Sequence, residues 1–169
     1  MKRGVKSNRG QIKISFGMIV SIILVIVFLV FAFYAIKIFL GIQNSAQGGK
    51  FVNDFQSDIN TVWRSAPSSQ HKEYSVSGKI ERICFIDFSI PGKGENKNIY
   101  DELGRANYGA ENLVFYPVGS SNPDSTKIDN INLDEMTSEN NPFCIPVVDG
   151  KLNLRLEKEV NEALVRVTR

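Results

Sequence analysis

The chain has 169 residues, of which 43% are hydrophobic, with 20 basic and 18 acidic residues and a formal net charge of +2. All 18 acidic residues but only 14 of the basic residues follow residue 42, so this larger part carries a net charge of −4. An acidic main part without a basic cluster argues against a nucleic-acid-binding protein. The only histidine, His71, makes a metal centre built from histidine ligands a poor prediction as well.

Residues 1–13 form a basic leader that we expect to stay in the cytoplasm. The leader contains no acidic residue and five basic ones, namely Lys2, Arg3, Lys6, Arg9 and Lys13. Basic residues beside a membrane span are retained on the cytoplasmic side. The amino end is therefore predicted to lie inside the cell and the rest of the chain outside it.

Residues 14–42 are predicted to form a transmembrane helix. Between Ile14 and Ile36 there is no charge, and 16 of the 23 residues are Ile, Leu, Val or Phe. A helix of this length reaches about 34 Å, which exceeds a hydrocarbon core of roughly 30 Å. A cleaved secretory signal peptide is the alternative, but its apolar region is usually shorter and is followed by small residues.

Residues 43–64 change to the pattern of an amphipathic helix beside the membrane. Phe51, Phe55, Ile59 and Val62 recur at helical spacing, and polar residues occupy the opposite side. This apolar stripe requires a partner surface. The sequence leaves two partners open, the protein's own sheet or neighbouring subunits.

Residues 65–73 read as a linker because of their Pro, Ser and charge content, and residues 74–169 as an extracytoplasmic β-domain. Residues 80–88 are apolar on both faces, which is typical of a central strand. Residues 112–118 form a second β-rich run. A final strand is expected at 163–168, where a helix is the alternative reading.

The strongest local signal is Asp149-Gly150 between residues 143–148 and 151–156. Asp-Gly supplies the positive φ angles of a two-residue hairpin turn. Leu152, Leu154 and Leu156 alternate with polar residues and are expected to face the core. The fold class is therefore predicted as α+β, with one amino-terminal transmembrane helix, its amphipathic extension, and a small, mainly antiparallel sheet or sandwich.

Cys84 and Cys144 both fall in the part predicted to be extracytoplasmic. An even cysteine count in an oxidising compartment favours one disulfide, and two buried free thiols remain the alternative. A bridge closing a loop of about 60 residues stabilises a fold by roughly 4 kcal/mol in the chain-entropy model.

The sequence offers little that resembles catalysis. His71 stands among Ser, Lys and Glu and reads as a solvated residue rather than the base of a triad. Asn130, Asn132 and Asp134 alternate as calcium ligands do, but Glu135 occupies the position that requires glycine. The expected protein is not an enzyme and holds no cofactor or metal.

The stretch Arg9 to Gly17, RGQIKISFG, resembles the class III signal of archaeal type IV pilins and archaellins. In that family a basic leader ending in Lys/Arg-Gly precedes the peptidase cut, and an uninterrupted apolar helix follows. The resemblance covers about 35 of the 169 residues. It implies processing between Gly10 and Gln11, with Gln11 as the new amino terminus.

Three positions depart from the family pattern, in which many archaeal pilins continue as QxSxE. Ser15 is displaced by two residues, Gly17 stands where Glu would be, and Lys13 puts a charge just after the implied cut. In bacterial-type pilins this Glu pairs with the new α-amine of a neighbour. The same layout of helix and external β-domain also resembles the accessory β-domain proteins of archaella and other single-pass archaeal membrane proteins.

The sequence therefore predicts a cell-membrane protein with one span, an inner amino end and an outer carboxyl domain that acts by contact. Its expected partners are the lipid bilayer and a protein, either another chain or a second copy bound through the helix. An unprocessed binding or assembly module is the alternative to a pilin-like or archaellum-associated component. A membrane-tethered enzyme is the remaining hypothesis.

Overall fold

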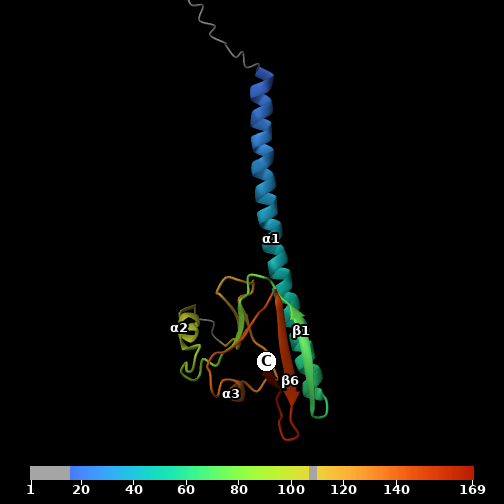
Figure 1. Cartoon of the computed structure of the whole chain (residues 1–169), viewed down its shortest axis with the longest axis vertical. Coiled ribbons are helices and arrows are strands. Elements are labelled where there is room, and N and C mark those ends of the chain that lie inside the picture. Colours follow the sequence, from blue (N-terminus) through green and yellow to red (C-terminus); the bar gives the residue numbers. More distant parts are fainter. Residues whose placement is uncertain (1–15, 107–109) are drawn as a thin grey trace, which may run out of the picture. The chain divides into compact units, whose positions relative to one another are not determined.

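A computed structural model describes residues 16–106 and 110–169. The elements follow in the order α1 (Phe16–Arg64), β1 (Ser68–Ser75), β2 (Arg82–Phe85), α2 (Lys97–Ala106), β3 (Leu113–Tyr116), β4 (Ser125–Thr126), α3 (Leu133–Met136), β5 (Phe143–Pro146), β6 (Lys151–Lys158) and β7 (Arg166–Thr168) (Figure 1). The chain divides after Leu40 into two units, of which the second contains the end of α1 and every strand. The predicted α+β class with a long amino-terminal helix is confirmed.

The second unit contains two antiparallel sheets. One sheet has the strand order β1-β6-β7 and the other the order β4-β3-β2-β5. β1 and β6 pair over eight residues, from Ser68 opposite Lys158 to Ser75 opposite Lys151, and run side by side in Figure 1. β2 lies between β3 and β5, so the prediction of a central strand is confirmed.

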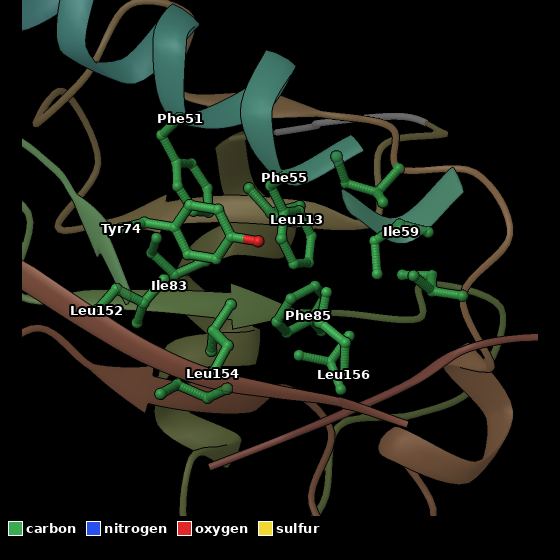
Figure 2. Packing of buried hydrophobic residues seen from close by; sticks show 14 of the residues in the cluster. Phe51, Phe55, Ile59, Tyr74, Ile83, Phe85, Leu113, Leu152, Leu154 and Leu156 are labelled. Atoms are coloured by element: carbon green, nitrogen blue, oxygen red, sulfur yellow. The ribbon is translucent and has the colours of Figure 1, made fainter. Parts of the chain in front are cut away.

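The end of α1 covers the inner faces of both sheets. Phe51, Phe55, Ile59 and Val62 are almost completely buried and share one core with side chains of both sheets. Figure 2 shows the helix side chains pointing at Tyr74, Ile83 and Phe85 and at the three leucines of β6. The sequence left two possible partners for this apolar stripe, and in the structure it packs on the protein's own sheets.

Aromatic side chains form the centre of this core. The Phe51 ring stacks on Phe55 at 5.5 Å between centroids and meets Tyr74 edge-on at 5.3 Å. The Phe115 ring of the other sheet lies 5.8 Å from Phe51, and that of Phe85 lies 5.9 Å from Phe55. Aromatic pairs in such arrangements contribute beyond their buried area. The two rings of α1 thus join one sheet to the other.

The second face of β2 packs on α2. Cys84 and Ile86 form a smaller core with Val114 of β3 and with Ile99 and Leu103 of α2. Along β2, Cys84 and Ile86 alternate with Ile83 and Phe85, whose side chains enter the main core. This explains why residues 80–88 read as apolar on both faces. The helix α2 itself was not predicted.

The prediction that residues 65–73 form a linker is wrong, because Ser68–Ser75 form β1. Its polar composition misled the prediction. Only Tyr74 of the strand is fully buried, while Lys72 on the same face bonds a carboxylate of α1 rather than packing in the core. Paired with β6 on one side only, β1 is an edge strand. Polar side chains are common on such strands.

The predicted hairpin around Asp149-Gly150 is confirmed only at its turn. Asp149 and Gly150 have φ values of 52° and 70°, and Val148 and Lys151 exchange both backbone hydrogen bonds. Beyond this pair the two strands separate, because β5 pairs with β2 and β6 with β1. The predicted alternation of β6 is confirmed, since its three leucines are buried. The expected last strand is confirmed as β7, although it is shorter than 163–168.

Replacing Phe55 by Ala should destabilise the second unit by about 3–5 kcal/mol, because the cavity opens between α1 and both sheets. The matched control is Ser57→Ala on the exposed side of the same helix, which should change stability by less than about 0.5 kcal/mol. The measurement is urea unfolding of the detergent-solubilised full chain, followed by Trp63 fluorescence. A loss below about 1 kcal/mol for Phe55→Ala would contradict this core.

Candidate interaction surfaces

The first part of α1 exposes an uninterrupted apolar surface. From Phe16 to Ile42 the large hydrophobic side chains are exposed on every side of the helix. The most apolar stretch of 18 residues within α1 contains no buried residue. Water would disfavour such a surface by roughly 25 cal/mol for each Å² of apolar area. By length and composition α1 can cross a membrane.

The two cysteines lie opposite each other on paired strands and form a disulfide. Cys84 of β2 is in register with Cys144 of β5, with 4.0 Å between their Cα atoms. The bridge joins two neighbours of the four-stranded sheet on the face that α2 covers. Of the two alternatives for these cysteines, the disulfide is therefore the one in the structure. A disulfide is typical of proteins outside the reducing cytosol.

The implied processing site, Gly10 and Gln11, lies outside the described residues. The structure of the described part begins at Phe16 within α1. Processing at this site therefore stays a prediction from the resemblance of the leader.

The residues considered for catalysis or metal binding are not brought together. His71 is exposed on the solvent face of β1, and Ser68 faces the other side of the strand. Asn132 caps α3 by accepting a bond from the Glu135 amide at 3.3 Å, while Asn130 donates to Asn60 of α1 at 3.0 Å. Within the described ranges no group of three His, Cys, Asp or Glu side chains has the arrangement of a metal site.

One ion-pair group connects α1 with β1. Asp58 accepts a hydrogen bond from Lys72 at 2.9 Å and another from the Tyr74 hydroxyl at 2.7 Å. Burial, followed by the bond to Asp58, raises the pKa of Tyr74, so this phenol stays protonated and keeps donating. Each half-buried carboxylate oxygen has its own donor. The group fixes the helix against the edge strand.

A second charged group surrounds Arg166 of β7. Its guanidinium donates to Glu135 at 2.5 Å, to Glu157 at 3.1 Å and to Glu159 at 2.9 Å. The bonds to Glu135 and then to Glu157 raise the pKa of Arg166. The carboxylates come from α3, from β6 and from the segment after β6. One arginine thereby holds the short last strand to three separate segments.

Glu162 lies beside this group, and its negative charge is repelled by Glu135 and Glu159. The pKa of Glu162 is raised above its ordinary value of 4.5, and burial is the largest cause. A hydrogen bond to Glu135 and repulsion from Glu135 and Glu159 raise this pKa further, while Arg166 lowers it. The folded state thus binds this proton more tightly than the unfolded state does. The stability from that proton is complete below about pH 4.5 and is lost as the pH rises through the folded pKa.

Neither charged group was predicted from the sequence. Asp58 is 14 residues from Lys72, and Arg166 is 31 residues from Glu135. Buried Asn141 was missed for the same reason, because its amide donates to the backbone of Asp87 and Ile90 more than 50 residues earlier. Such contacts depend on which strands pair, and local sequence patterns do not contain this information.

Comparisons with protein-family models, with curated proteins and with solved structures give no match to this chain.

Glu162→Gln should raise the stability of the second unit at pH 7, because the glutamine amide supplies a donor toward Glu135, which the ionised carboxylate lacks, and removes one charge. The advantage over the wild type should shrink as the pH falls to 5, since acid protonates Glu162 in the wild type. Urea midpoints of the full chain in detergent at pH 5, 6 and 7 measure the effect.

The matched control is Glu95→Gln, which removes the same charge at an exposed position before α2. Its difference from the wild type should be the same at each pH. A Glu162→Gln chain that is less stable than the wild type at pH 7 would contradict the repulsion described for this residue.

Proposed function

We propose that the protein is a single-pass membrane protein whose outer domain works by contact, as a pilin-like or archaellum-associated component of the cell surface. One observation carries the proposal. The apolar side chains of α1 are exposed from Phe16 to Ile42 and enter the core of the β-domain from Phe51 to Val62. A single helix thus supplies both a lipid-facing segment and the scaffold of the folded domain.

The charges and the disulfide support an outer location for this domain. The basic leader precedes the apolar segment, and basic residues favour the cytoplasmic side. The Cys84–Cys144 bridge favours an oxidising compartment for the other side. Both signals give the same orientation, with the amino end inside and residues after the span outside.

A role by contact is supported by how the polar side chains of the domain are used. Asp58, Glu135 and Asn132 all bond other parts of the chain. His71 lies exposed on a flat strand face. A general base or nucleophile requires a second polar group within hydrogen-bond reach and aimed at a substrate. Binding to lipid and to another protein, including a second copy through the helix, needs no such group.

The alternative is an anchored binding or assembly module that keeps its leader. Lys13 and Gly17 favour it, because they place a charge near the implied cut and remove the carboxylate that pilins use there. The layout of the protein is the same in both cases. The two hypotheses differ only in whether the chain is cut after Gly10.

Co-expression with an archaeal class III signal peptidase should produce a chain that begins at Gln11, because Arg9-Gly10 supplies the leader end that this peptidase class recognises. Intact mass and amino-terminal sequencing of the membrane fraction measure the cut. The Gly10→Ile chain should keep all of its leader and serves as the control. An intact wild-type leader beside an active peptidase would contradict the pilin-like version and favour the unprocessed module.

A further inference from the structure

One end of the β-domain is formed by three loops that meet where α1 enters it. β2 begins at Arg82, opposite the ends of β3 at Tyr116 and of β5 at Pro146. The segments 76–81, 117–121 and 147–150 therefore leave the sheets at the same end, which we call the entry rim. Backbone hydrogen bonds from Glu81 to Tyr116 and from Val147 to Glu81, both at 2.8 Å, tie the three loops together.

Helix α1 packs directly on this rim. A Cβ atom at Gly48 would overlap the Oγ atom of Ser121, so the helix and the loop approach each other closely at this glycine. At the other end of the domain, Lys158 of β6 donates to the backbone of Trp63 and Ser65. The helix thus runs from the rim at Gly48 to the opposite end at Trp63.

Two valines project from the rim into solvent. Val118 is 41% exposed and Val148 is 59% exposed, whereas half of the ten valines after Gly41 are buried. Each precedes a residue with positive φ, Gly119 at 83° and Asp149 at 52°. The tight turns hold both valines at loop tips.

The link between the apolar segment and the rim is short. Five residues, 43–47, separate Ile42 from Gly48, and α1 continues through them. At 1.5 Å per residue the six steps from Ile42 to Gly48 span about 9 Å, and a fully extended link would reach only about 20 Å. The polar headgroup layer on each side of a bilayer is about 5–8 Å thick. If the span ends at Ile42, the entry rim is therefore close to the headgroups.

We propose that the entry rim rests on the bilayer that holds α1, with Val118 and Val148 inserted among the lipid headgroups. The proposal rests on the membrane span proposed above. Apolar side chains at an interface gain free energy in proportion to the area they remove from water. The contact would fix the orientation of the domain on the membrane surface.

The charges of the rim define the kind of lipid surface it fits. Its exposed charged residues are Lys79, Glu81 and Asp149, and the adjacent Lys151 pairs with Glu73 at 2.9 Å. This set has no excess of positive charge. Contact should therefore depend on the valines and should not require anionic lipid.

The test places one tryptophan at a time in the full chain on a Trp63→Phe background, reconstituted in phosphatidylcholine vesicles that contain 5-doxyl lipid. Val148→Trp and Val118→Trp should both be quenched by the doxyl lipid and emit at shorter wavelength than in the detergent-free urea-unfolded chain. The matched control is Val160→Trp, since Val160 is 81% exposed and follows Lys158 at the opposite end of the domain. It should not be quenched. The three valines and Trp63 are all exposed, so the substitutions should not disturb the core. A fully oxidised Cys84–Cys144 pair in each variant verifies folding.

Equal quenching at Val148→Trp and Val160→Trp, or quenching that appears only with anionic lipid, would overturn the proposal. A fourth variant, Val27→Trp, separates this failure from failure of the membrane span, and it is measured with 12-doxyl lipid because Val27 lies near the middle of the proposed span. Quenching at Val27→Trp without quenching at the rim would retain the span and reject the rim contact. No quenching at Val27→Trp would reject the span together with the inference that rests on it.

Discussion

The structure depends on the contact between the second half of α1 and the two sheets. Phe51 and Phe55 each touch aromatic rings from more than one strand, and these strands belong to different sheets. Without the helix, a three-stranded and a four-stranded sheet with strands of two to eight residues would expose their inner faces. Small sheets need a covering element of this kind to be stable. The helix is therefore part of the domain and more than an attachment to it.

The two parts of helix α1 differ in the pattern of their side chains. The segment up to Ile42 has apolar side chains all round, while the segment from Phe51 has one apolar stripe and one polar face. The close approach of Gly48 to Ser121 marks where the second pattern begins to pack. Because one continuous element carries both patterns, the folded domain is held within a few residues of any membrane that the first segment crosses.

The sequence predicted those features that depend on neighbours along the chain. The apolar run, the amphipathic stripe, the alternation of β6 and the turn at Asp149 all rest on local spacing, and the structure has them. The pairing of Cys84 with Cys144 was also predicted, from their number and predicted compartment. Partner choice was not predictable in this way. The strands on each side of Asp149-Gly150 join different sheets, which no property of the turn indicates.

The polar contacts show the same limit. A strand with the composition of a linker was missed because its lysine and tyrosine are stabilised by Asp58, a residue of another element. Helix α2 was missed because Ile99 and Leu103 are the only buried residues among those of its side chains that the structure describes, and two apolar residues make a weak periodic signal. The Arg166 group needs β6, β7 and α3 to be placed first. What the sequence could not supply is the set of long-range pairings that bring these side chains together.

The central claim is that the segment from Phe16 to Ile42 crosses a membrane with the β-domain on the outer side. Protease added to sealed cells, followed by detection of a carboxyl-terminal tag, tests it most directly, with detergent-opened cells and a cytoplasmic marker protein as controls. The account predicts loss of the tag in sealed cells, where the marker stays intact, and recovery of the full chain only with the membrane pellet after alkaline extraction. A tag that is protected in sealed cells but cut in opened ones, or a full chain that leaves the membrane without detergent, would contradict it.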